Sequence, residues 1–423
     1  MHPDPRSRPA PSRDACARWT SSSAPSDPPS TEPHHRPPTG PRPGRTLPRD
    51  AVTAVEPRSH PTQETAISVL LASPMRELDQ LVAGSDPLDA ARDAPRLPAL
   101  NRAGDIAGLD RLARTWHGRV AANVRDTVTA GAALRDLGFA LASLERHGVD
   151  FRSVPGAEET LLRLGARTGE VPRDSVYTYA LRNPEDAVRS FTELPEEALF
   201  IREVRTAGVA LRPAVDALLA ALPLPAEDPA LAGLLAEATR GFTVFAQSLL
   251  AVKRAITPQT FSGELRPYFP PMTVGGQVLY APGGAQMTPL LVDILLIRPE
   301  PGDRAEEWYE GYLRENLPYL PAAYRAASDR ARRHRPLLPR LVDEAGAHSP
   351  VRPAAARTLA GLRALMRELL RFRLPHLQLA KANMNIRPDG SLGSGGYTTD
   401  SLDHLAELTL ARHRLLSGAP TEK

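Results

Sequence analysis

The 423-residue sequence contains a single cysteine, Cys16, which lies near the N-terminus. One thiol cannot form an intrachain disulfide, and its position excludes cysteine-ligated metals from the rest of the chain. No apolar run reaches the roughly 18 residues that a membrane-spanning helix needs. No apolar stretch near Met1 has the pattern of a secretory signal. We therefore expect a soluble, cytoplasmic protein without a membrane partner.

A strong net charge of one sign and pairs of histidines at metal-binding spacing are also missing. Lysine and arginine number 52 against 49 aspartate and glutamate, which gives a formal net charge of +3. The basic residues are spread along the chain and form no face interleaved with aromatics, so no nucleic-acid partner is expected. HxxxH and HExxH spacings do not occur, which argues against a zinc site. Any catalytic chemistry must therefore come from side chains other than cysteine and zinc-binding pairs of histidines.

Residues 1–64 lack hydrophobic periodicity and are crowded with proline, serine and arginine. Such a segment contains too little apolar surface to offset the entropy of ordering it. A transit peptide would be poor in acidic residues, whereas this segment has several. We expect a disordered tail, or a stretch that is not translated because the start codon is assigned too early.

After the tail, apolar residues recur at spacings of three and four, which predicts an all-α fold. We divide it into a helical part at 65–225 and a second helical part, with the candidate site, at 226–423. Residues 262–288 are so rich in glycine, proline and aromatics that we expect irregular structure there. Helices are expected near residues 65–82, 127–147, 196–222 (kinked or split at Pro213), 229–255, 289–297, 351–382 and 399–416.

His376 lies in the sequence LLRFRLPHLQLAK of a long predicted helix. A lone histidine on an apolar face is most often a core side chain bonded to a carbonyl. Three features favour a haem-iron ligand instead. The surroundings are apolar, Arg371 and Arg373 are close enough on the helix to pair with propionates, and Pro375 frees a carbonyl that can orient the imidazole.

The other histidines after the tail are weaker candidates. Only His404 is expected near the candidate site, on the last helix. The rest have polar or charged neighbours and are expected at the surface; they are His117, His147, His334, His348 and His413.

Two further segments offer groups for a ligand. The loop Gly393-Ser394-Gly395-Gly396-Tyr397 is either a flexible linker or a lid whose amides hold a carboxylate or a dioxygen-derived oxygen. Arg266 lies near Phe261, Tyr268 and Phe269 in the sequence. It is either half of a surface stacking pair or a clamp for an amino-acid carboxylate, with Phe261 stacking on an aromatic side chain.

Together these segments resemble the indoleamine and tryptophan dioxygenase superfamily of haem proteins. In that superfamily an axial histidine on a helix precedes a Gly-Ser/Thr-Gly-Gly loop, the order of His376 and Gly393–Gly396. Phe261 and Arg266 match in spacing the phenylalanine and arginine with which indoleamine dioxygenase holds its substrate. Within it, the chain more closely resembles the monodechloroaminopyrrolnitrin synthase branch, at residues 86–105, 134–147, 256–277, 319–325 and 370–397.

The resemblance implies an all-α, indoleamine 2,3-dioxygenase-like fold that binds haem b. His376 would be the metal ligand, and Arg371 and Arg373 would contact the cofactor. Ser394 would be catalytic. The substrate-binding residues would be Phe261, Arg266, Ser394, Gly395 and Gly396.

The implied function is antibiotic biosynthesis with tryptophan or 7-chlorotryptophan as substrate, and with dioxygen or peroxide and an electron donor as partners. The leading reaction is a pyrrolnitrin-type ring rearrangement and decarboxylation. Indole-ring dioxygenation or aromatic amino-acid hydroxylation is the alternative within enzymes, and a helical binding protein without haem is the alternative from another class. Met384 stands where the family carries a tyrosine near the substrate, so the substrate and reaction can differ from the family's.

The tail can be tested by truncation. Because residues 1–64 lack the apolar content to fold, a protein starting at Thr65 should keep the haem content and melting temperature of the full chain. Absorption spectra and thermal unfolding of both proteins measure this. A large drop in either quantity would show that the tail packs on the folded part.

Overall fold

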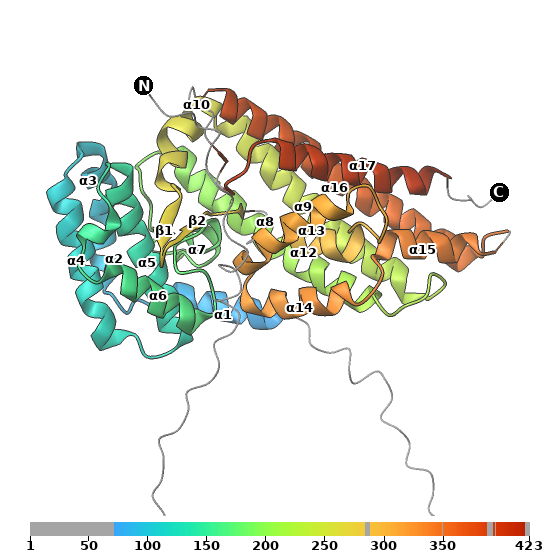
Figure 1. Cartoon of the computed structure of the whole chain (residues 1–423), viewed down its shortest axis with the longest axis horizontal. Helices are drawn as coiled ribbons and strands as arrows, with labels where there is room; N and C mark the ends of the chain where they lie inside the picture. The colour runs from blue at the N-terminus through green and yellow to red at the C-terminus, as the bar shows by residue number, and fades with distance from the viewer. Residues whose placement is uncertain (1–71, 284–287, 349, 387–391, 394, 419–423) are drawn as a thin grey trace, which may run out of the picture. The chain divides into compact units, whose positions relative to one another are not determined.

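Helices account for nearly every element of the computed structural model (Figure 1), which bears out the all-α prediction. The structure describes residues 72–283, 288–348, 350–386, 392–393 and 395–418. The expected tail and Ser394 lie outside these ranges. Residues 70–423 form one compact unit, and the division near residue 225 stays a prediction.

The first helices of the unit surround α5, Thr127–Arg146, which matches the helix expected at 127–147. Asp126 begins it with a capping box that includes Thr129, and residues 130–144 are all buried. Helices α1, α4 and α6 pack against α5. The elements of this region are α1 (Ala72–Gly84), α2 (Ala90–Asp93), η3 (Ala94–Arg96), α3 (Leu97–Ala103), α4 (Ile106–Asn123), η4 (Phe151–Ser153), α6 (Ala157–Thr168) and α7 (Val176–Leu181).

Four longer helices match their predicted positions and pack side by side (Figure 1). They are α8 (Pro195–Ala221), α9 (Ala230–Ala255), α16 (Pro353–Asn385) and α17 (Asp400–Gly418). Helix α8 continues through Pro213, so the split considered there does not occur. Helix α9 packs along both α8 and α16, and this tertiary packing offsets the hydrogen bond that proline removes. No described helix combines the length and apolarity needed to cross a bilayer.

The segment between α9 and α12 is irregular, as its composition predicts. It runs through α10 (Pro258–Thr260), a π-helical turn η5 (Phe261–Leu265) and a 3₁₀ turn η6 (Arg266–Tyr268). A hairpin follows, in which β1 (Met272–Val274) pairs antiparallel with β2 (Gln277–Leu279). Gly275 and Gly276 both have positive φ, as a two-residue hairpin turn requires.

Helix α12, Pro289–Leu296, is buried along its whole length, as the apolar run at 289–297 predicts. The remaining elements connect it to α16. They are α13 (Glu306–Asn316), η7 (Leu317–Tyr319), α14 (Ala322–Arg332) and α15 (Leu337–Gly346).

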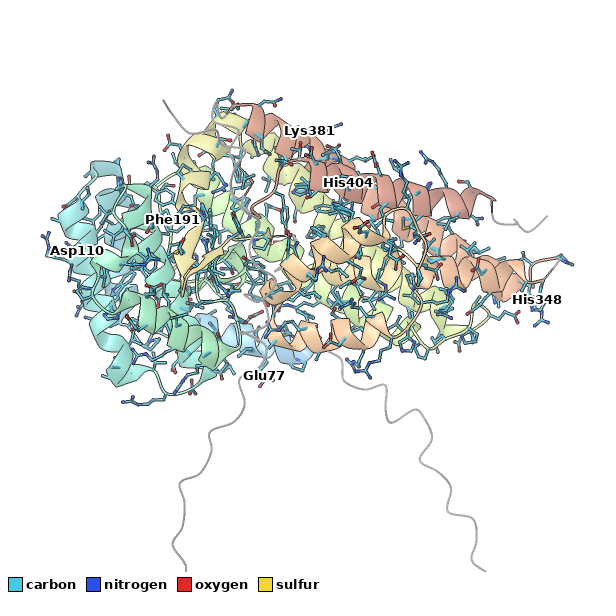
Figure 2. The ribbon with its side chains drawn as sticks, viewed as in Figure 1. Glu77, Asp110, Phe191, His348, Lys381 and His404 are labelled. Carbon is cyan, nitrogen blue, oxygen red and sulfur yellow. The ribbon has the colours of Figure 1, made fainter. Side chains whose placement is uncertain are left out.

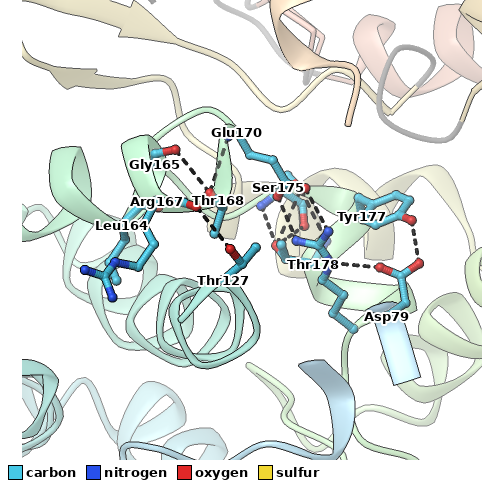
Figure 3. Close-up of polar contacts among 12 residues, drawn as sticks. Asp79, Thr127, Leu164, Gly165, Arg167, Thr168, Glu170, Ser175, Tyr177 and Thr178 are labelled. Atoms are coloured by element: carbon cyan, nitrogen blue, oxygen red, sulfur yellow. Dashed lines mark hydrogen bonds and ion pairs between the residues drawn. The ribbon is translucent and has the colours of Figure 1, made fainter. Parts of the chain in front are cut away.

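A buried group of charged side chains joins α1, α7 and α8. Asp79 accepts a hydrogen bond from the Tyr177 hydroxyl at 2.5 Å (Figure 3). It also accepts one from the Arg182 Nε at 2.9 Å and pairs with Arg212. Arg182 pairs as well with Glu170 at 2.7 Å. Buried charges are costly unless they are paired and hydrogen-bonded, so this cluster fixes one arrangement of the three helices.

The contact between α8 and α9 can be tested with two glycines of α9. A Cβ on Gly241 would lie 2.6 Å from the Ala210 carbonyl oxygen, whereas a Cβ on the exposed Gly233 would meet nothing within 4 Å. Gly241→Ala should therefore cost about 1–3 kcal/mol of unfolding free energy. Gly233→Ala should gain up to about 1 kcal/mol through helix propensity. Urea unfolding measures both, and a neutral or stabilising Gly241→Ala would contradict the close crossing.

Candidate active site

A cavity of about 360 Å³ lies among α8, α9 and α16, a size typical of ligand and cofactor sites. The rest of its wall comes from α7, η5, η6, residues 282–283, α12, α13, the loop before α17, and α17 itself. Most of the wall is apolar, so the few polar groups decide what the cavity can bind. The large apolar lining residues are Val176, Phe200, Val204, Phe245, Leu249, Val252, Ile256, Phe261, Leu290, Phe372, Leu379, Met384, Leu392, Leu402 and Leu405.

His376 lies on the cavity face of α16. Phe372 and Leu379, four residues before and three after it, share that face, and the Phe372 ring stacks on the imidazole with centroids 5.3 Å apart. Burial, assisted by the nearby Arg373 cation, lowers the pKa of His376 to about 4. The imidazole is therefore neutral at pH 7, the form in which histidine ligates a metal.

Arg373 contributes a buried cation to the same wall. Its Nη2 lies 2.6 Å from Oδ1 of Asp293 on α12, and both side chains are almost fully buried. Burial raises the pKa of Asp293, and the Arg373 guanidinium opposes that shift. The Nε of Arg373 has no partner among the described residues. The guanidinium therefore keeps one donor that an anionic group can still use.

Phe261 and Arg266 both line the cavity, as the carboxylate-clamp interpretation requires. The Phe261 ring packs on Phe200 with centroids 5.7 Å apart. Arg266 is only 8% exposed, so the interpretation as a surface stacking pair is wrong. Its guanidinium donates to the carbonyl of Phe269 and, at 3.3 Å, to that of Leu392. These bonds join the η6 turn to the loop before α17.

The glycine-rich loop reaches the cavity through Gly393 and Gly395. Gly396, expected in the substrate-binding set, does not line the cavity. Its φ is 81°, and a Cβ there would lie 2.7 Å from the Tyr280 ring. Only glycine therefore allows the backbone to approach that ring so closely. Ser394 lies outside the described residues, and its catalytic role stays a prediction.

Several polar contacts of the cavity wall were not predicted from the sequence. The Tyr397 hydroxyl donates to Glu315 at 2.7 Å and accepts from the Asn316 side chain at 2.8 Å. Asn383 accepts from the Ser262 hydroxyl through its backbone carbonyl at 3.1 Å. Its side-chain Oδ1 is buried without a partner among the described residues. Tyr397 ends the glycine-rich motif, and Asn383 lies seven residues after His376 on the same helix face.

A sequence profile of the monodechloroaminopyrrolnitrin synthase PrnB family matches residues 120–416, well over half of the chain. The chain belongs to this family. The resemblance and the enzyme prediction are confirmed, and so is the indoleamine dioxygenase-like helical fold class. The match runs from α4 to α17 and contains every described residue of the cavity.

Arg371 does not reach the cavity of this PrnB-family chain. It is exposed at the surface of α16 and pairs with Glu368 at 3.3 Å. Arg371 lies five positions before His376, which turns its side chain about 140° away around the helix. The expected contact of Arg371 with the cofactor is therefore not supported, and of the two arginines before His376 on α16 only Arg373 lines the cavity.

His404, the other histidine expected near the site, is exposed on α17 (Figure 2). Its ring stacks on Trp308 with centroids 4.8 Å apart, and Nδ1 lies 2.8 Å from the Asp400 carbonyl oxygen. His348 is also exposed, as expected (Figure 2). Within the described ranges, no group of three His, Cys, Asp or Glu side chains could hold a metal. The proposed metal ligation therefore rests on His376.

The lowered pKa of His376 predicts a pH dependence for the protein prepared without haem. The folded-state pKa of about 4 lies below the ordinary 6.5, so between these values the unfolded chain takes up a proton that the folded chain excludes. Stability should fall as pH drops through this window, by at most about 3 kcal/mol from His376. Urea unfolding at pH 7 and pH 4.5 should show a smaller loss in His376→Gln than in wild type. Equal losses of stability in both proteins would show that protonation of His376 does not cause the pH dependence.

Proposed function

We propose that the protein is a haem b-dependent enzyme that acts on tryptophan or a halotryptophan in a pyrrolnitrin-type ring rearrangement and decarboxylation. Membership of the PrnB family supports a place in pyrrolnitrin biosynthesis. The observation that carries the haem proposal is the neutral imidazole of His376, which faces a largely apolar cavity bounded by long helices.

The side chains around His376 fit a haem group. The apolar lining suits the faces and edges of a porphyrin, which is largely hydrophobic. Arg373, with a buried Nε that lacks a partner among the described residues, suits a propionate. Bound haem would supply activation of dioxygen or peroxide, with electrons from an external donor. His376 would hold the iron, and Asp293 would fix the Arg373 guanidinium beside it.

We assign substrate binding to residues of the cavity that lie outside α16. Arg266 would hold the amino-acid carboxylate through charge-assisted hydrogen bonds, and its burial would strengthen them. Phe261 would stack on the indole ring. Backbone amides of Gly395 and its neighbours, together with Ser394, would hold an oxygen atom of the substrate or oxidant.

Met384 favours a second candidate reaction. It lines the cavity, where a thioether replaces the phenolic hydroxyl expected from the family resemblance. A thioether donates no hydrogen bond, so the indole or carboxylate would be held differently. Indole-ring dioxygenation or aromatic hydroxylation therefore remains the alternative, and product analysis after incubation with tryptophan and 7-chlorotryptophan distinguishes the three reactions.

The haem assignment is tested by the absorption spectrum. Wild-type protein should show a Soret band, and His376→Ala should lose most of its haem or shift that band, because the cavity wall would lack its iron ligand. Added imidazole should partly restore the wild-type spectrum. Arg371→Ala is a matched control that should retain full haem content, since Arg371 lies outside the cavity.

Two results would contradict the assignment. One is full haem occupancy with an unchanged spectrum in His376→Ala, which would exclude this histidine as the iron ligand. The other is a wild-type protein that binds no haem even after reconstitution, which would favour a helical binding protein.

A further inference from the structure

Glu203 places a carboxylate on the cavity wall. It lies on α8, where Phe200, Val204 and Ala207 also line the cavity. The spacing of these four residues puts them on one face of the helix. Glu203 therefore belongs to the cavity face of α8. A carboxylate on a largely apolar wall is costly unless a partner compensates its charge.

The charges next to Glu203 leave its carboxylate available to a ligand. It pairs with Arg202 at 3.4 Å, a long contact to a side chain that is 65% exposed, whereas the Glu203 side chain is 17% exposed. Exposed pairs of this kind contribute little. The other acidic residue of the described cavity wall, Asp293, is engaged by Arg373 at 2.6 Å. A ligand cation in the cavity would thus be drawn to Glu203.

The neighbouring wall suits a protonated amine. Ser248, on the adjacent helix α9, also lines the cavity and offers a neutral hydroxyl acceptor. An ammonium group has three N–H donors, which two carboxylate oxygens and a hydroxyl can accept. A guanidinium or a metal ion would require more acceptors or carboxylates than this wall provides.

We propose that the Glu203 carboxylate holds the α-ammonium group of the substrate and makes the site selective for zwitterionic aromatic amino acids. The inference rests on the proposed amino-acid substrate and adds the group that recognises its amine. Glu203 is a specificity-determining residue in this assignment. It would favour tryptophan over indole acids that have the same ring and carboxylate but no amine.

Three indole ligands test the proposal by calorimetric titration of the full-length, haem-loaded protein. L-Tryptophan has both charged groups, tryptamine has only the amine, and indole-3-propionate has only the carboxylate. Glu203→Gln should weaken binding of tryptophan and tryptamine about ten- to a hundred-fold, because a charge-assisted bond is lost. Indole-3-propionate should bind as tightly as before or more tightly. Glu203→Asp, which keeps the charge, should restore part of the tryptophan affinity.

Arg202→Gln is the matched control, since Arg202 contacts Glu203 but does not line the cavity. It should leave all three affinities within about threefold of wild type. An equal loss for the three ligands in Glu203→Gln, or no loss for any, would overturn the proposal while leaving the amino-acid function standing. Wild-type protein that binds none of the three would overturn the amino-acid function and this inference together.

Discussion

The buried ion pair between Arg373 and Asp293 is the constraint on which the candidate site depends. It joins α16 to α12 across 2.6 Å, three residues from His376 on the same helix. Removing either partner would leave an uncompensated buried charge, which typically costs about 3–5 kcal/mol. The pair therefore specifies how α16 faces the cavity, and it keeps a cation beside the imidazole without leaving the net charge of that wall positive.

The cation has a second effect, on the histidine itself. Arg373 and burial act in the same direction on His376, and both disfavour the imidazolium form. A cofactor with carboxylate groups would reverse part of this effect by bringing negative charge to Arg373. The wall thus keeps the imidazole neutral before any cofactor binds, so iron ligation would require no deprotonation step near neutral pH.

Hydrophobic periodicity predicted the helices well, because α5, α9, α12 and α16 each bury a face or their whole surface. It could not show that α8 continues through Pro213, since packing against α9 decides this. The same periodicity, applied further, would have separated the two arginines. Arg373 lies about 60° from His376 around the helix and Arg371 about 140°, so only one can share its face. The family resemblance indicated Phe261 and Arg266, which line the cavity from a π-helical turn and the 3₁₀ turn after it; no hydrophobic spacing predicts these turns.

The sequence did not indicate that Glu203 and Asn383 line the cavity, and the physical reason is the same for both. A polar residue on a long helix is usually solvated, and nothing in its type distinguishes a cavity from bulk water. Only the neighbours on the same helix face carry the signal, as Phe200, three residues before Glu203, and Ala207, four residues after it, do here. Asn383 has a buried Oδ1 without a partner among the described residues, and its energetic cost is of order 1–3 kcal/mol unless a ligand supplies a donor. Polar atoms left in this state at a largely apolar cavity disfavour apolar ligands, so they contribute to selectivity even where they add little affinity.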